Sequence, residues 1–243
     1  MEEVFQRLRK FNVKLNPQKT DLCSTEITWC DRKISVEGIQ FDSEMIESSL
    51  SLPEPENATN FQKFLCRANW IRSSIPEYAT EVAPLQELMG EVMRSTGSAK
   101  SFKLKSVQLK EIWKEEHSRC FERMKHIIAY SVRVAHEKDG YEVCLFTDAS
   151  DFHWGVIVTQ MPKEDLDLDV LVQRHEPLAF LSGTFKRSQK HWSVIEKEAF
   201  PIVEAVERLR HLLLRDEGFR LFTDPRNLIY VFDPILRDND VKK

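Results

Sequence analysis

The sequence predicts an α/β (α+β) fold in which a largely helical segment precedes a mixed β-sheet with flanking helices. Three observations support this prediction. Apolar residues recur at helical spacing over residues 59–71 and 107–129. Residues 141–223 alternate short β-branched runs with one long helical pattern. Small and polar residues at 95–100 form the clearest linker, which suggests two separately folded parts.

The helical segment begins with a helical pattern at residues 4–11. A strand-like pair is expected at 13–15 and 27–35, with Gly38 as a turn signal. Thr59 is expected to cap the helix that follows it, because a threonine hydroxyl accepts hydrogen bonds from the first free amides of a helix. Two further helices are expected after this one, at 84–93 and 107–129.

The second part shows the order strand, strand, strand, helix, strand, helix. The expected strands lie at 141–147, 155–160, 177–183 and 219–223. A long helix is expected over 188–214, and a short helix or turn over 227–232. The apolar stripe of the long helix comprises Ile195, Ala199, Ile202, Val203, Val206, Leu209 and Leu213. Three antiparallel strands followed by a helical crossover predict a mixed sheet.

Composition narrows the class of protein. The five cysteines are scattered and odd in number, so we expect a reducing compartment and no disulfide scaffold. No apolar run approaches the roughly 18 residues of a membrane-spanning helix, and no secretory signal opens the chain. These features predict an intracellular protein, cytoplasmic or nuclear, with no membrane partner.

Charge is unevenly distributed along the chain. The 35 basic and 39 acidic side chains give a net charge of −4, which argues against a protein driven onto nucleic acid by its total charge. Residues 101–140 nevertheless form a basic island of nine basic and six acidic side chains. The island either binds nucleic acid or solvates the outer face of a helix whose aromatic residues, Trp113 and Phe121, belong to the core.

Three acidic residues stand out by their positions. Asp148 and Asp224 each end a predicted strand with the same three residues, Phe-Thr-Asp. Glu198 borders the apolar stripe of the long helix, whereas Glu196 and Lys197 are expected to point into solvent. Converging carboxylates repel one another unless a cation neutralises them, and oxygen-rich sites suit Mg²⁺ or Mn²⁺. The alternative is that the two aspartates cap turns and Glu198 pairs with an arginine.

The order of these motifs resembles a known family. Thr147-Asp148-Ala149-Ser150-Asp151, then Glu196-Lys197-Glu198-Ala199, then Phe222-Thr223-Asp224-Pro225 is similar to the ribonuclease H domain of gypsy-like LTR retrotransposon polyproteins. Lys14-Leu15-Asn16-Pro17 resembles the end of the reverse transcriptase palm of the same polyproteins. Asn69-Trp70-Ile71-Arg72 resembles its thumb. The resemblance covers nearly the whole chain.

The resemblance implies an organisation and an activity. Residues 1–94 would be the end of the palm and the thumb, 95–138 the connection, and 139–243 a ribonuclease H-like domain. Asp148, Glu198 and Asp224 would be the catalytic and metal-binding residues, holding Mg²⁺ (Mn²⁺ possible) to hydrolyse the RNA strand of an RNA–DNA hybrid. The residues implied to contact nucleic acid are Lys14, Asn69, Trp70, Arg72, Ser150 and Gln189.

The sequence departs from the family in two respects. No Tyr-x-Asp-Asp occurs, so the polymerase active site is expected to be absent, and the missing polymerase portion becomes a possible partner. Only 19 residues follow Asp224, so the last strand and helix of the domain are expected to be lacking. None of the acids there, Asp233, Asp238 and Asp240, stands in the context of the family's fourth carboxylate. The alternative function is therefore a catalytically dead remnant that binds nucleic acid or protein.

Overall fold

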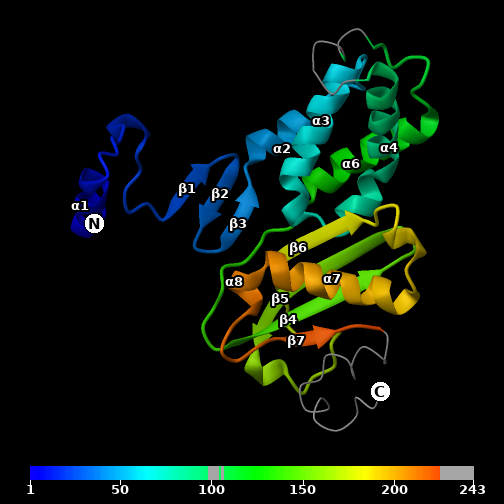
Figure 1. Cartoon of the computed structure of the whole chain (residues 1–243). Coiled ribbons are helices and arrows are strands. Elements are labelled where there is room, and N and C mark those ends of the chain that lie inside the picture. Colours follow the sequence, from blue (N-terminus) through cyan, green and yellow to red (C-terminus); the bar gives the residue numbers. More distant parts are fainter. Residues whose placement is uncertain (98–103, 105–106, 225–243) are drawn as a thin grey trace.

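The computed structural model describes residues 1–97, 104 and 107–224 (Figure 1). Two hydrophobic cores form within these residues, one between Phe41 and Ile128 and the other between Val143 and Leu213. The fold class is confirmed, with helices packed together in the first part and a mixed sheet in the second. The boundaries assigned to the palm, thumb, connection and nuclease remain predictions. No helix in the described ranges is long and apolar enough to cross a membrane.

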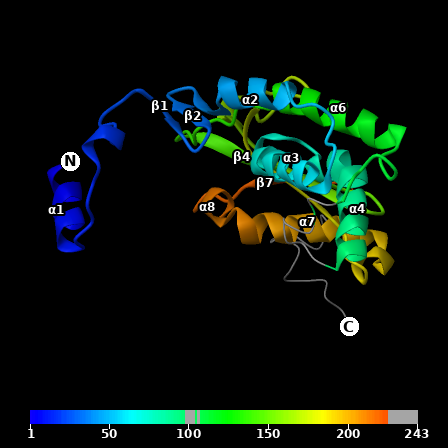
Figure 2. The ribbon, with the colours of Figure 1, turned by 90° about the horizontal axis from the view of Figure 1, so that it is seen from above.

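The first part begins with α1 (Glu2–Lys10), which stands apart from both cores (Figure 1 and Figure 2). A three-stranded antiparallel sheet follows, with the order β1 (Glu26–Trp29), β2 (Arg32–Ser35) and β3 (Gly38–Phe41). The expected strand at 13–15 is wrong, because these residues form no strand. The run at 27–35 instead folds back on itself at Cys30 and Asp31, whose φ angles of 50° and 60° suit a tight hairpin.

Helices form the first core. They are α2 (Ser43–Leu50), α3 (Ala58–Ile71), α4 (Tyr78–Thr96) and α6 (Glu115–Ala129). Asn57, and not Thr59, caps α3, since its side chain accepts a hydrogen bond from the Asn60 amide at 3.0 Å. Pro84 lies inside α4 and does not begin it. The helix expected from 107 begins only at Glu115, because the Leu109 amide donates to the Glu56 carbonyl.

The second part is a four-stranded sheet with the order β6-β5-β4-β7. Its strands are β4 (Tyr141–Ala149), β5 (His153–Pro162), β6 (Glu176–Thr184) and β7 (Arg220–Phe222). The first three pair antiparallel, and β7 lies parallel to β4, as a mixed sheet requires. All four strands were expected from the sequence. The helix or turn expected at 227–232, together with Asp233, Asp238 and Asp240, lies outside the described residues.

One face of this sheet is covered by α7 (Val194–Arg208) and α8 (Arg210–Leu213) (Figure 1). The single helix expected over 188–214 is wrong, because Ser193 caps α7 at its start and the helix ends at Leu209. The buried face of α7 also differs from the apolar stripe expected from the sequence. Ile195 and Val203 are 46% and 47% exposed, while Lys197 and Glu198 are buried. The buried face therefore includes charged residues that an apolar pattern does not reveal.

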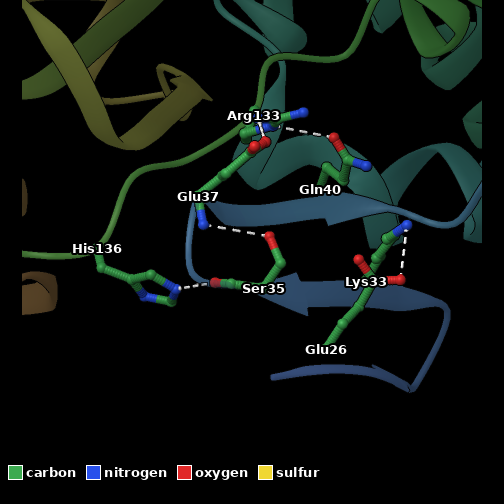
Figure 3. Close-up of polar contacts among 7 residues, drawn as sticks. All are labelled: Glu26, Lys33, Ser35, Glu37, Gln40, Arg133 and His136. Atoms are coloured by element: carbon green, nitrogen blue, oxygen red, sulfur yellow. Dashed lines mark hydrogen bonds and ion pairs between the residues drawn. The ribbon is translucent and has the colours of Figure 1, made fainter. Parts of the chain in front are cut away.

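An extended connecting segment (residues 131–138) joins the two parts. Its Val134 exchanges two backbone hydrogen bonds with Ile39 of β3, and the Ala135 amide donates to the Pro177 carbonyl of β6 at 2.7 Å. Figure 3 shows Arg133 bonded to Glu37 and Gln40, and a ring nitrogen of His136 2.7 Å from the Ser35 carbonyl oxygen. The small sheet is thus attached to the larger one through this segment.

Candidate functional site

The two Phe-Thr-Asp sequences lie side by side. Strands β4 and β7 pair in parallel with Phe146 opposite Phe222. The two rings stack with centroids 4.5 Å apart and planes at 10° to each other. The same register continued by two residues brings Asp148 beside Asp224 at the carboxyl ends of both strands. Both aspartates are exposed.

Glu198 approaches this pair from α7, which packs on β4 and β5. It is 8% exposed, and its Oε2 atom is buried with no hydrogen-bond partner. Burial raises the pKa of the Glu198 carboxyl, and the charges of Asp148 and Asp224 raise it further. The structure therefore brings the three sequence-predicted carboxylates into one electrostatic neighbourhood. The arginine partner that the alternative interpretation gives to Glu198 is not seen among its described contacts.

The three carboxylates fit a divalent cation by their chemistry. Their donors are all oxygens, which Mg²⁺ and Mn²⁺ prefer, and a buried carboxylate oxygen without a partner is costly unless something binds it. The hydroxyls of Thr147 and Thr223, which directly precede the two aspartates, are also buried without partners. Within the described residues, however, no three acidic, histidine or cysteine side chains are already gathered as metal ligands. The three acids are near one another, but their side chains are not yet arranged as a complete set of metal ligands.

Local sequence explains how α7 presents Glu198. Ser193 and Glu196 form a reciprocal capping box, with the Glu196 Oε2 atom 2.8 Å from the Ser193 amide. Glu196 is exposed, as expected. Phe200, one turn further on, packs edge to face on Trp154 of β5 with centroids 5.7 Å apart. Cap and ring contact together fix where the first two turns of α7 lie on the sheet.

Lys197 was expected to point into solvent, and this prediction is wrong. Its side chain is 11% exposed, and its Nζ atom lies 3.1 Å from the Asp151 Oδ1 atom. Asp151 belongs to the turn between β4 and β5. The helical pattern predicted the wrong exposure for Lys197 because such a pattern considers apolar residues only. A lysine can be buried when its amine has an acidic partner.

A cavity of about 260 Å³ opens beside Asp148, between the helical part and the sheet. Glu77 and Thr80 line it from the start of α4, and Ser150 and His153 line it from the sheet. Burial lowers the pKa of His153. The Ala79 amide donates to the Ser182 hydroxyl at 2.9 Å, which fixes α4 against β6 near this cavity. Glu77 and His153 were not predicted from the sequence, since nothing in their local sequence marks a contact between distant segments.

The six residues expected to contact nucleic acid lie in three places. Asn69, Trp70 and Arg72 are exposed together at the end of α3, and the Arg72 guanidinium donates to the Asn69 side chain at 3.4 Å. The Arg32 guanidinium of β2 stacks on the Trp70 ring at 5.6 Å. Lys14 lies between α1 and β1, in a segment that Figure 1 shows apart from α3.

Ser150 and Gln189 have structural partners. The Ser150 hydroxyl accepts from the His153 amide at 3.0 Å and organises the β4–β5 turn. The Gln189 side-chain oxygen accepts from the Lys186 amide at 2.6 Å. Ser150 also lines the cavity beside Asp148, whereas Gln189 begins the short 3₁₀ helix η4 (Gln189–His191) after β6.

Contacts in the basic island favour the solvated-helix alternative. Arg123 pairs with Glu81 at 2.5 Å and Lys125 with Glu122 at 3.1 Å, so neighbouring acids neutralise them. Phe121 is 1% exposed and belongs to the core, as that alternative requires. Lys103 and Lys105 lie outside the described residues.

The second part of the chain is similar to a known family of domains. Residues 138–242 match the family described as the RNase H-like domain found in reverse transcriptase. Over 230 residues, the chain is 25% identical to the transposon Tf2-3 and Tf2-4 polyproteins of Schizosaccharomyces pombe, covering 94% of this chain and 16% of each relative. It therefore spans about one-sixth of the length of these relatives.

Solved structures of reverse transcriptases share the fold of this chain. A foamy viral protease-reverse transcriptase in complex with an RNA/DNA hybrid matches 99% of this chain and 30% of its own, with a TM-score of 0.65 and 16% identity. The same kind of enzyme with double-stranded DNA matches 87% of this chain and 33% of its own, with a TM-score of 0.62 and 18% identity. The chain is thus similar to a reverse transcriptase and ribonuclease H segment of LTR retrotransposon polyproteins.

Proposed function

We propose that this segment hydrolyses the RNA strand of RNA–DNA hybrids in a reaction that depends on Mg²⁺ or Mn²⁺. Asp148, Glu198 and Asp224 are the proposed metal-binding and catalytic residues. The observation that carries the proposal is the parallel alignment of the two Phe-Thr-Asp strand ends opposite a buried Glu198 oxygen without a partner. Packing alone gives no reason to bring two acids from adjacent strand ends and one from a helix close together.

Each acid has a distinct part in the proposal. Glu198 lies on the buried face of α7 and supplies the fixed ligand, while the exposed Asp148 and Asp224 complete the site from two adjacent strands. A divalent cation bound there would activate a water and stabilise the leaving oxygen of a phosphodiester. The three carboxylates give the site its negative charge and fix where a cation would bind. The sheet that carries two of them shields one side of the site from water.

Binding of a hybrid is part of the same proposal. The exposed group of Asn69, Trp70 and Arg72, with Arg32 stacked on the tryptophan, offers donors to phosphates and an aromatic face to a sugar or base. Two of the structurally similar proteins are complexes with an RNA/DNA hybrid or double-stranded DNA, which supports this part of the proposal. Choice of the RNA strand would depend on its 2′-hydroxyl groups.

Cleavage and binding can be measured separately. Wild-type protein and Asp148→Asn are incubated with a labelled RNA–DNA hybrid in Mg²⁺ or Mn²⁺, and binding is measured in EDTA at several salt concentrations. The proposal predicts cleavage by the wild type alone and binding by both. If neither cleaves but both bind with a steep salt dependence, the chain is a nucleic-acid-binding module instead. If neither binds at low salt, a protein-interaction role remains.

A further inference from the structure

We propose that the ion pair between Lys197 and Asp151 positions the carboxylate site by holding α7 against the turn that follows β4. Lys197 directly precedes Glu198 on the helix, and Asp151 comes three residues after Asp148. The pair therefore joins the two chain segments that carry two of the three acids. This inference rests on the proposed function, because it concerns the geometry of that metal-binding site.

Apolar packing does not explain why the Lys197 side chain is buried. The Lys197 side chain is 11% exposed, whereas its partner Asp151 is 81% exposed. Val194 and Ile195, which precede Lys197 on α7, are 70% and 46% exposed. At its start, α7 thus exposes two apolar residues and buries an amine, although burying an ammonium group is costly unless it is paired.

The turn at the other end of the pair is firmly organised. The Ser150 amide donates to the His153 carbonyl at 2.8 Å, and the Ser150 hydroxyl accepts from the His153 amide at 3.0 Å. The Phe185 amide donates to the Phe152 carbonyl at 2.9 Å. A turn fixed to its own strand and to the segment after β6 cannot follow α7 independently. The Lys197–Asp151 contact therefore sets the position of the helix relative to the end of β4.

Geometry and simple electrostatics predict different signs for the effect of this pair. If the charges act only through their fields, removing the Lys197 cation strengthens binding of Mn²⁺ nearby, and removing the Asp151 anion weakens it. If the pair positions α7, removing either partner weakens binding, because Glu198 is released from its place. The two explanations are therefore separated by whether the two single variants change the Mn²⁺ affinity in the same direction or in opposite directions.

The test measures Mn²⁺ binding to the whole chain without substrate, by electron paramagnetic resonance of free Mn²⁺. Lys197→Met and Asp151→Asn are each expected to weaken binding about tenfold, as loss of a residue that orients a ligand usually does. The double variant should be no weaker than either single variant, because both remove the same contact. Lys197→Arg should retain most of the affinity.

A matched control is available at the opposite end of β5. Lys163 forms an ion pair with Glu217 at 2.7 Å, and Lys163→Met removes the same charge far from the carboxylates. This variant should bind Mn²⁺ as the wild type does. If Lys197→Met fails to fold, Lys197→Ala removes the same cation and the same contact with Asp151, and the two explanations again predict opposite signs.

Two outcomes overturn the inference, and they can be told apart. Opposite signs for the two single variants, or affinities within about twofold of the wild type, would show that the pair does not position the site while leaving the proposed function intact. No Mn²⁺ binding by the wild type, with no cleavage of a hybrid, would overturn the proposed function and this inference together.

Discussion

Phe146 of β4 stacks on Phe222 of β7 with ring centroids 4.5 Å apart, two residues before Asp148 and Asp224. The paired rings fix the register of the short strand β7, which has only three residues of its own. They therefore determine which acid lies beside Asp148. The repeated Phe-Thr-Asp sequence has a structural meaning, since the phenylalanines align the aspartates.

This stack predicts an effect on metal binding. Phe222→Leu should lower the free energy of unfolding by about 1 kcal/mol through the lost aromatic contact. It should also weaken Mn²⁺ binding several-fold, because Asp224 loses its anchor. Phe219→Leu, which alters a ring packed against the second hydrophobic core, serves as the control and should leave the affinity unchanged. Equal losses of affinity in both variants would show that the stack has no special part.

The buried Glu198 predicts a pH-dependent cost to stability. Its pKa is raised in the folded protein, so the folded chain retains this proton to higher pH than the unfolded chain. Stability therefore falls as pH rises from the ordinary glutamate pKa through the raised one. In EDTA, Glu198→Gln should increase the melting temperature at pH 7, and the gain should vanish near pH 4.

Glu204 provides the control for this experiment, because it lies on the same helix and pairs with Arg208 at 2.5 Å. Glu204→Gln should not stabilise the protein at pH 7. A melting temperature for Glu198→Gln that stays at or below the wild-type value throughout this range would contradict the raised pKa.

An acid at the far end of the sheet predicts the opposite pH dependence. Asp165 is 2% exposed, and hydrogen bonds from the Arg174 side chain and amide lower its pKa to about 2. Its contribution to stability is thus present above the ordinary aspartate pKa and is lost as pH falls towards 2. Asp165→Asn should lower the melting temperature at pH 7, and the difference should shrink below pH 4. The exposed neighbour Asp167, changed to Asn, should have little effect.

The connecting segment predicts a strict requirement for glycine at position 38. Gly38 has a φ of 131°, and a Cβ there would overlap the carbonyl oxygen of Val134. Gly38→Ala should therefore destabilise the protein by about 2 kcal/mol or more in urea unfolding. Gly140 also has a positive φ, of 77°, but has open space around it. Gly140→Ala should cost only about 1 kcal/mol, and equal costs would show that the contact with Val134 is unimportant.

Much of the fold was predictable because the strands of the second part carry strong local signals. The strands ending at Asp148 and Asp224 were expected from their β-branched and aromatic residues, and the structure places their ends together. Breaks in helices were less predictable. The late start of α6 depends on a contact with a distant segment, because the Leu109 amide donates to the Glu56 carbonyl.

The candidate site was only partly predictable for a related reason. Sequence periodicity locates an acid near a buried face, as it did for Glu198, but cannot say which charged residue is buried through a partner. Lys197 and Asp151 are 46 residues apart, and neither has a local feature that reveals the other. Glu77 comes to the cavity beside Asp148 only through the packing of α4 against β6.

Cleavage of a uniformly labelled RNA strand, annealed to DNA, is the most direct measurement of the proposed activity. The wild-type chain should cut the RNA in Mg²⁺ or Mn²⁺, should not cut it in EDTA, and should leave single-stranded RNA intact. Asp148→Asn, Glu198→Gln and Asp224→Asn should each reduce the rate by at least about a hundredfold, a loss of at least roughly 2.7 kcal/mol in transition-state stabilisation. Cleavage that persists in all three variants would contradict a nuclease site formed by these carboxylates.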